Sequence, residues 1–249
     1  MPRDERALDA AGLTDPGVPT VMATGDLEIL GLLPRSSNYT FLARAGEGEG
    51  ATLVVYKPRR GEIPLWDFPE GTLCQREVAA YLVARSLGWP NVPPTILRDG
   101  PEGVGSVQRF VPFDPEAHYF TLEPERADDF RKVALFDVVV NNADRKGGHC
   151  LLGEDGTIWV IDHGVCFSEE PGKLRTVIWE HVGEPIEASL LADLRRFREE
   201  LHGGAAGVAL AALLAPEELG ALADRADAVL ADGRFPEPGP GRPYPWPPV

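Results

Sequence analysis

The sequence contains few cysteines, and none of them lies in a spacing typical of metal sites or disulfide frameworks. Its 249 residues include three cysteines, Cys74, Cys150 and Cys166, which occur singly in apolar surroundings. Structural zinc sites usually draw on closely spaced cysteine pairs, and disulfide frameworks on larger sets of cysteines. We therefore expect three buried thiols, without disulfides or zinc ligands.

Basic residues are also scarce relative to acidic ones. The chain has 24 Lys and Arg against 39 Asp and Glu, a net charge of −15. This balance disfavours nonspecific binding to nucleic acid or to an anionic membrane surface. No run of about 18 apolar residues is present, and the acidic start lacks the apolar stretch of a secretory signal. We expect a cytoplasmic protein with no nucleic-acid partner and no stable membrane anchor.

Two polar loops stand out, because each is linked to an apolar run. Residues 141–149 read NNADRKGGH, and residues 158–164 read IWVIDHG. The segment between them contains GEDG at 153–156, which predicts a hairpin turn, so both loops should emerge from one small sheet. This would bring Asp144 and Asp162 together as phosphoryl transfer requires, with one carboxylate facing the acceptor hydroxyl and the other holding the metal on ATP.

The order D-R-x-x-x-[N/H], short hairpin, I-D-x-G resembles the catalytic and metal-binding loops of the phosphatidylinositol 3-/4-kinase-like superfamily. It is most similar to type II phosphatidylinositol 4-kinases, and it also resembles an actinobacterial group of kinase-like proteins. The resemblance spans roughly residues 25–185 and includes VVYKPR at 54–59, similar to the strand that carries the nucleotide lysine. It implies an α+β, two-lobed, protein-kinase-like fold with a small β-rich N-lobe and a mainly helical C-lobe. It also implies that Asp144 is catalytic and that Asp162 binds magnesium.

Composition, pattern and the two lobes that the resemblance implies together divide the chain into four segments. We expect a loosely ordered segment over 1–24, the N-lobe over 25–111, the C-lobe over 112–234 and a Pro-rich strap over 235–249. The strap could instead be a ligand for a partner. Packing on the C-lobe is favoured because Tyr244 and Trp246 would otherwise be exposed.

Lys57 ends an apolar strand and is a candidate for phosphate binding. Apolar residues at helical spacing predict a helix over about 71–87, with Glu77 on its buried side. A buried carboxylate needs a cationic partner. Lys57 is the natural candidate, and the pair would match the Lys–Glu pair with which kinases orient phosphates. Glu62 or Glu70 could be the true partner, and Glu77 could be a surface residue.

Two further segments are candidate nucleotide contacts. The turn containing Ser36, Ser37 and Asn38 takes the place of a glycine-rich loop and could cover the phosphates, although it could also be an ordinary hairpin tip. By resemblance, the strand ending at Gln108, Arg109 and Phe110 becomes the hinge that contacts adenine. Strand-end packing is the alternative for these three residues.

The loop after Asp144 departs from the family pattern. The superfamily usually has Asn five residues after the catalytic Asp as a second metal ligand, whereas this chain has His149. An imidazole there could favour Mn²⁺ over Mg²⁺, or it could only hydrogen-bond the loop. Lys146 could reach the γ-phosphate or be a solvated lysine. A local basic cleft is conceivable, since Lys57, Arg59, Arg60, Arg145 and Lys146 fall in these segments.

The function predicted from these residues is that of an ATP-dependent kinase requiring Mg²⁺ or Mn²⁺. Because the charge disfavours an anionic bilayer, the acceptor should be a soluble protein or a small molecule. Two alternatives remain: an AMP-transferring enzyme of the kinase fold, and a nucleotide-binding pseudokinase that acts as an interaction module.

Overall fold

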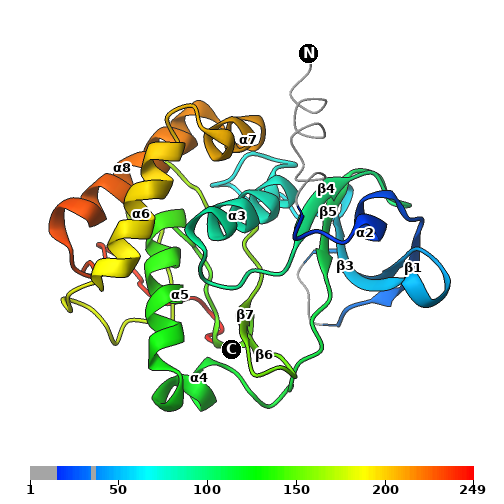
Figure 1. Ribbon diagram of the computed structural model, residues 1–249, viewed down its shortest axis with the longest axis horizontal. Coiled ribbons are helices and arrows are strands. Elements are labelled where there is room, and N and C mark those ends of the chain that lie inside the picture. Colours follow the sequence, from blue (N-terminus) through cyan, green and yellow to red (C-terminus); the bar gives the residue numbers. More distant parts are fainter. Residues whose placement is uncertain (1–15, 35–37) are drawn as a thin grey trace.

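An antiparallel five-stranded sheet forms the N-lobe. A computed structural model describes residues 16–34 and 38–249. The strands follow the order β1-β2-β3-β5-β4, so β3 and β5 lie next to each other in the sheet (Figure 1). Their bounds are β1 Leu27–Leu32, β2 Phe41–Ala45, β3 Thr52–Pro58, β4 Thr95–Arg98 and β5 Gly105–Arg109.

The alternation of side chains along β3 separates the core from the candidate site. Val54, Tyr56 and Pro58 are buried in the lobe, while Val55 and Lys57 are less buried. Successive residues of a strand point to opposite faces, so residues 55 and 57 share the face away from that core. Lys57 pairs with Ser106 of β5 in the register of the sheet. The strand therefore presents Lys57 opposite the core-facing residues.

Helix α3, Leu73–Leu87, lies between the sheet and the helices of the other lobe (Figure 1). The carboxylate of Glu62 accepts hydrogen bonds from the N–H groups of Leu73 (3.1 Å) and Cys74 (2.8 Å). A carboxylate at this helix end satisfies free donors and complements the helix dipole. Gly88, at φ 87°, ends the helix in the left-handed conformation. Glu62 thus caps α3 instead of pairing with Lys57.

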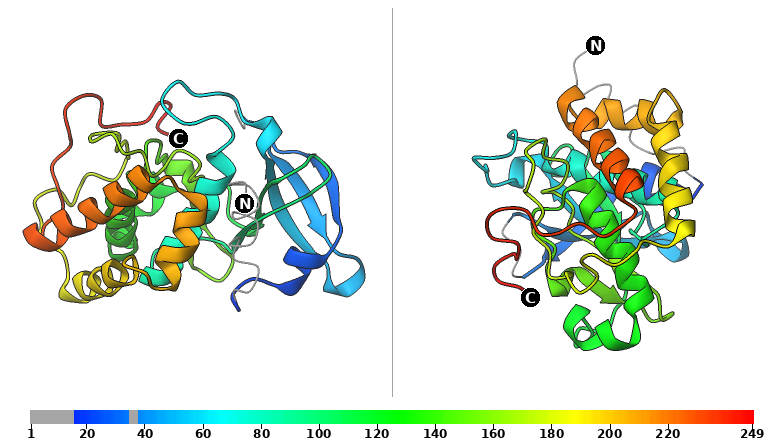
Figure 2. Two further views of the ribbon diagram at one scale, coloured as in Figure 1. Left: turned by 90° about the horizontal axis from the view of Figure 1, so that it is seen from above. Right: turned by 90° about the vertical axis from the view of Figure 1, so that its left-hand side faces the viewer.

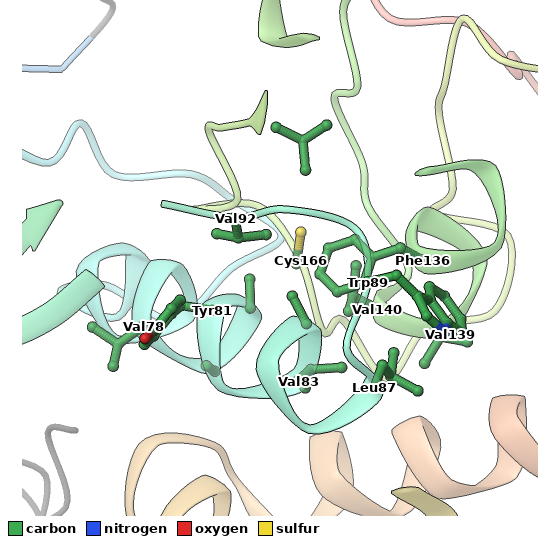
Figure 3. Close-up of a cluster of buried hydrophobic side chains, with 14 of the residues drawn as sticks. Val78, Tyr81, Val83, Leu87, Trp89, Val92, Phe136, Val139, Val140 and Cys166 are labelled. Carbon is green, nitrogen blue, oxygen red and sulfur yellow. The ribbon is translucent and has the colours of Figure 1, made fainter. Parts of the chain in front are cut away.

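The C-lobe is mainly helical and contains one small hairpin. In Figure 3, Leu87 of α3 lies close to Val139 of α5, and both belong to one buried apolar cluster, so the apolar core continues from one lobe into the other. The elements are α4 Tyr119–Leu122, α5 Ala127–Val140, β6 Cys150–Leu152, β7 Ile158–Val160, α6 Ala188–Glu200, α7 Ala205–Leu213 and α8 Pro216–Asp232. The expected α+β, two-lobed, protein-kinase-like fold is therefore confirmed.

The expectation of a loosely ordered start through residue 24 is wrong for its final part. Residues Thr20–Thr24 form the short helix α2, and Met22 is fully buried in the core. Arg98 fixes this segment by donating hydrogen bonds to the carbonyls of Met22 and Gly25, both at 2.8 Å. Residues 1–15 lie outside the described part of the chain.

The helices can also be compared with the dimensions of a bilayer. Within residues 16–34 and 38–249, no helix has both the length and the apolar character needed to cross a membrane.

The Pro-rich tail is extended and contacts the C-lobe (Figure 2, red). The carbonyl of Pro248 accepts a hydrogen bond from the N–H of Gly147 (2.8 Å), and that of Pro243 accepts one from Thr176 (3.0 Å). We expected this packing because Tyr244 and Trp246 would otherwise be exposed, and that reason is wrong. Tyr244 and Trp246 remain 49% and 74% exposed, and the hydrogen bonds of Pro243 and Pro248 are made by their backbone carbonyls.

A buried ion pair joins α3 to the far end of the C-lobe. The guanidinium of Arg76, which is 1% exposed, pairs with Glu218 near the start of α8. Arg76 also donates a hydrogen bond of 2.6 Å to the carbonyl of Cys166. The second oxygen of Glu218 accepts the N–H of Ala215 at 2.7 Å. Helix α3 is thus held to two other parts of the C-lobe.

We predict that Glu218→Gln lowers the free energy of unfolding by about 3–5 kcal/mol, because the charge of Arg76 stays buried without compensation. Asp227→Asn is the matched control, since Asp227 pairs with Arg198 and its side chain is 53% exposed. That control should cost less than about 1 kcal/mol. Urea unfolding of both variants measures the difference, and equal losses would show that the Arg76 pair does not stabilise the lobe contact.

Candidate active site

Lys57 is the centre of the site, because it joins three elements. Its ammonium pairs with Oε1 of Glu77 on α3 and with Oδ1 of Asp162 on the loop after β7, the latter at 2.9 Å. The second oxygen of Glu77 accepts the backbone N–H of His163 at 2.9 Å. Glu77 is 3% exposed, as predicted for a carboxylate on the buried side of its helix. The Lys57–Glu77 pair inferred from the sequence is present.

The charges of these groups are mutually stabilised. Burial acts to lower the pKa of Lys57, but the carboxylates of Asp162 and Glu77 outweigh it, and the pKa is raised. In turn, the Lys57 ammonium holds the pKa of the Asp162 carboxyl well below its usual range. Both groups are therefore charged at neutral pH. The site places one cation against two anions, one of which is half-exposed.

The second carboxylate, Asp144, lies on the loop that follows α5. Its N–H donates to the side-chain oxygen of Asn142 (3.0 Å), and its Oδ2 lies 3.2 Å from the ammonium of Lys146. Burial raises the pKa of Asp144, the Lys146 charge opposes this, and the nearby Asp162 carboxylate adds to the rise. A raised pKa suits a carboxylate that takes a proton. Lys146 is paired with Asp144 and is not an isolated solvated lysine.

Asp162 and His149 face each other at the open end of the β6–β7 hairpin. Its side chain is 49% exposed, and its Oδ2 lies 3.3 Å from Nε2 of His149. Asp162 has a φ of 64°, in the left-handed region that costs energy for residues other than glycine and that clusters at functional sites. Among the described residues, no group of three or more His, Cys, Asp and Glu side chains is arranged to hold a metal.

His149 is largely buried and lies in hydrogen-bonding positions on both sides of its ring. Nδ1 accepts the N–H of Lys146 at 3.4 Å, which leaves Nε2 with the proton and directs it toward Asp162. Burial lowers the pKa of His149 to about 4, so the ring is neutral at pH 7. In this tautomer His149 orients Asp162. To coordinate a metal through Nε2, the ring would have to move its proton to Nδ1 and lose the Lys146 contact.

A fully buried network lies beneath both loops. Arg145 is 0% exposed and donates to both oxygens of Asp137 on α5 at 3.0 Å, with a third contact at 3.2 Å. It also donates to the carbonyl of Ile161 (2.8 Å) and contacts Nε2 of His163 (2.7 Å). Burial opposes the charge of Arg145, but Asp137 outweighs it, and the pKa of Arg145 is raised. Arg145 therefore joins the Asp144 loop both to α5 and to the Asp162 loop.

Only part of the turn that we expect to cover the phosphates lies within the described residues. Ser36 and Ser37 lie outside the described residues. Asn38 is described, and its side-chain oxygen accepts the N–H of Ile63 at 2.8 Å. The neighbouring N–H of Tyr39 donates to the carbonyl of Gly61 at 3.2 Å. Asn38 thus joins the base of this turn to the segment after β3.

The three residues predicted to contact adenine are engaged in the sheet and its surroundings. The side chain of Gln108 donates to the hydroxyl of Thr95 at 2.9 Å. The N–H groups of Arg109 and Phe110 donate to the carbonyls of Pro94 and Leu53, at 2.8 and 2.9 Å. The guanidinium of Arg109 lies 5.1 Å from the ring centroid of Trp159 on β7. Adenine contact by these residues would use groups other than those N–H donors.

Sequence reasoning missed the roles of Asp137 and Arg145. We counted Arg145 toward a possible basic cleft, and that expectation is wrong because Arg145 is buried against Asp137. A signal was available: Asp137 is the lone carboxylate within the apolar run 133–140, and a buried carboxylate requires a cation. The same argument identified Glu77 correctly.

No family model matches the chain. It is 42% identical over 262 residues to Protein Rv2133c of Mycobacterium tuberculosis (strain ATCC 25618 / H37Rv), an alignment that covers 91% of this chain and 94% of that protein. The chain therefore belongs to the family of Protein Rv2133c.

More distant similarity connects the chain to proteins that are named as kinases. It is 31% identical over 137 residues to phosphatidylinositol 4-kinase gamma 4 of Oryza sativa subsp. japonica, covering 47% of this chain and 24% of that protein. For phosphatidylinositol 4-kinase gamma 4 of Arabidopsis thaliana, the identity is 27% over 159 residues, covering 53% and 28%. The chain thus spans about a quarter of the length of these plant proteins. The crystal structure of the Helicobacter pylori proinflammatory kinase CtkA gives a TM-score of 0.49 at 10% identity, covering 85% of this chain and 94% of that one.

We predict that Asp137→Asn lowers the free energy of unfolding by about 3–5 kcal/mol, because Arg145 would remain charged and buried without a counterion. Asp129→Asn on the same helix is the control. Asp129 pairs with Arg126, both partly exposed, and its loss should cost less than about 1 kcal/mol. Denaturant unfolding compares the two variants. A loss below about 1 kcal/mol in Asp137→Asn would contradict the stabilising role of this pair.

Proposed function

We propose that this protein is an ATP- and divalent-metal-dependent phosphotransferase that transfers the γ-phosphoryl group to a hydroxyl of a soluble acceptor. The observation that carries this proposal is the position of Lys57. It pairs with Glu77 on α3 and with Asp162 on the loop after the hairpin, and Asp162 is near enough to Asp144 for the two charges to interact. Kinase sites use such a Lys–Glu pair for phosphate, one Asp for metal and another for the acceptor hydroxyl.

The donor chemistry of the site fits a nucleotide-bound metal. Mg²⁺ in such sites commonly takes one or two protein carboxylates and obtains its other ligands from phosphates and water. Asp162 offers a half-exposed carboxylate that remains charged beside Lys57. His149 supplies either a second ligand or a hydrogen bond that orients Asp162. ATP with Mg²⁺ or Mn²⁺ would provide the phosphoryl group and neutralise part of its charge.

Side chains of the protein itself position the phosphates and accept the proton of the acceptor. Lys57, held by Glu77, positions a positive charge for the phosphates. Asp144 receives the proton of the acceptor hydroxyl, and burial favours this by raising its pKa. Lys146 holds the Asp144 carboxylate in place at 3.2 Å and brings a second positive charge beside it. Gln108, Arg109, Phe110 and the turn at Ser36, Ser37 and Asn38 remain the candidate contacts for adenine and phosphate.

The net charge of the chain supports one class of acceptor over another. The plant relatives are named as phosphatidylinositol 4-kinases, which supports a kinase-type reaction. The net charge of −15 disfavours approach to an anionic bilayer, so we propose a soluble protein or small molecule as the acceptor. Incubation with ATP and analysis of the products tests the reaction. Phosphoryl transfer yields ADP, transfer of AMP would yield pyrophosphate, and a pure binding protein would leave ATP intact.

We predict that Lys57→Met lowers the rate of ADP formation by about 100-fold, the usual scale for losing one preorganised electrostatic contact in an active site. Lys132→Met on α5 is the matched control and should retain the wild-type rate. Both rates are measured by chromatography of the nucleotides. Wild-type turnover by Lys57→Met would show that Lys57 does not bind phosphate.

We also predict that ATP with Mg²⁺ or Mn²⁺ raises the melting temperature and that Asp162→Asn removes most of the metal-dependent part of this rise. His149→Asn tests the second ligand, because it replaces the imidazole by an oxygen-bearing side chain. If His149 coordinates the metal, the response should shift from Mn²⁺ toward Mg²⁺. An unchanged metal-dependent rise in Asp162→Asn would exclude Asp162 as a ligand, and equal selectivity in His149→Asn would leave His149 as an orienting residue.

A further inference from the structure

The Pro-rich tail contacts the catalytic loop three residues after Asp144. The N–H of Gly147 donates to the carbonyl of Pro248 at 2.8 Å. Gly147 lies between the tail and α4: a Cβ added there would come within 2.9 Å of the ring of Phe120 and 3.5 Å of the Pro248 carbonyl. A Cβ at Gly148 would lie 3.9 Å from the side chain of Val249. The end of the tail therefore covers the backbone that follows Asp144 and Lys146.

The tail also contacts the segment that follows Asp162. The carbonyl of Pro243 accepts two hydrogen bonds, from the N–H of Thr176 (3.0 Å) and from the indole N–H of Trp179 (3.1 Å). Thr176 in turn lies in a parallel bridge with Arg145, next to Asp144. The tail, the segment around Thr176 and the catalytic loop therefore run side by side. The carbonyls of Pro248 and Pro243 accept hydrogen bonds from the two segments next to Asp144.

Among the described residues, three hydrogen bonds join residues 243–249 to the rest of the chain, and all three are accepted by backbone carbonyls of this segment. Proline has no N–H, so the prolines at 243, 245, 247 and 248 can offer only carbonyl acceptors. Their restricted φ angles reduce the entropy lost when the tail docks. Pro245 is buried, but Tyr244 and Trp246 are 49% and 74% exposed, so the aromatic side chains within residues 243–249 keep much of their surface in solvent. Three hydrogen bonds of modest net strength are consistent with a segment that can dock and detach.

We propose that the part of the strap formed by residues 243–249 restricts the access of phosphoryl acceptors to Asp144 when docked and admits them when detached; from here on, the strap means this part. This inference rests on the proposed function, because it assigns the strap to the acceptor side of the same site. The positions of Gly147 and Thr176 carry it: both belong to segments adjoining Asp144, and both donate to the strap. Lys57 and Glu77, which we assign to phosphate binding, have no hydrogen bond to the strap among those described.

Water can serve as the phosphoryl acceptor in the test, so the natural acceptor need not be known. In this reaction the water oxygen bonds to the γ-phosphorus, the bond from that phosphorus to the β-phosphate oxygen breaks, and a water proton passes to Asp144, giving ADP and inorganic phosphate. Removing residues 243–249 should raise the rate of phosphate release at least several-fold. The rise in melting temperature caused by ATP and metal should stay the same, because the phosphate-binding residues are untouched.

A milder pair of variants covers the case in which the shortened chain does not fold. Trp179→Phe removes one donor to Pro243, and Trp89→Phe removes an equivalent donor whose bond to Asp193, also 3.1 Å, lies away from the strap. Loss of one hydrogen bond shifts a docking equilibrium by roughly 2- to 12-fold. Phosphate release should rise by about that factor in Trp179→Phe and stay at the wild-type rate in Trp89→Phe.

The outcomes distinguish a failure of the inference about the strap from a failure of the proposed function. If ATP raises the melting temperature of the intact chain and of a folded shortened chain, yet both release phosphate at the same rate, the strap does not control access. Equal rises in Trp179→Phe and Trp89→Phe would likewise overturn the inference, since they would reflect general loosening. If ATP with metal has no effect on the melting temperature of the intact chain, the proposed function fails, and the inference that rests on it fails too.

Discussion

The buried ion pair between Arg145 and Asp137 is the interaction on which the geometry of the site depends. Arg145 lies on the same loop as Asp144, and its guanidinium reaches Asp137 on α5, the carbonyl of Ile161 and the ring of His163. Four segments of the chain therefore meet at this ion pair, since the hydroxyl of Thr176 also donates to Asp137 at 3.4 Å. A charge buried this deeply is tolerated only with a full set of partners, so the loops cannot shift independently without a large energetic cost.

A second set of ion pairs connects the two lobes through α3. Glu77 on this helix pairs with Lys57 of the sheet and accepts the N–H of His163, while Arg76, its neighbour, pairs with Glu218 on α8. Adjacent helical residues point in different directions, about 100° apart, which lets one helix hold the sheet on one side and the C-lobe on another. The position of Lys57 relative to Asp162 therefore depends on contacts far from the site.

Sequence patterns predicted the elements around the site, and the failures of prediction have identifiable causes. The helix predicted over about 71–87 occurs as α3, the strands that carry Lys57 and Gln108 occur as β3 and β5, and the predicted hairpin occurs as β6 and β7. Helix α7, Ala205–Leu213, was not identified: its mostly small, apolar residues lack a polar face to give a clear period. Helix α2 was missed because a five-residue helix has too little sequence to show periodicity, and its order comes from Arg98 and burial of Met22.

The sequence by itself determined the residues whose chemistry depends on local pattern: two carboxylates on loops beside one hairpin, a lysine on an apolar strand, and a glutamate on a buried helix face. Each follows from a period or from the cost of burying an unpaired charge. Only the tertiary structure decided which distant groups become partners. It paired Arg145 with Asp137, turned Glu62 into the cap of α3, and laid the strap beside Gly147. These contacts join residues remote in sequence, and their choice depends on three-dimensional packing that no local pattern encodes.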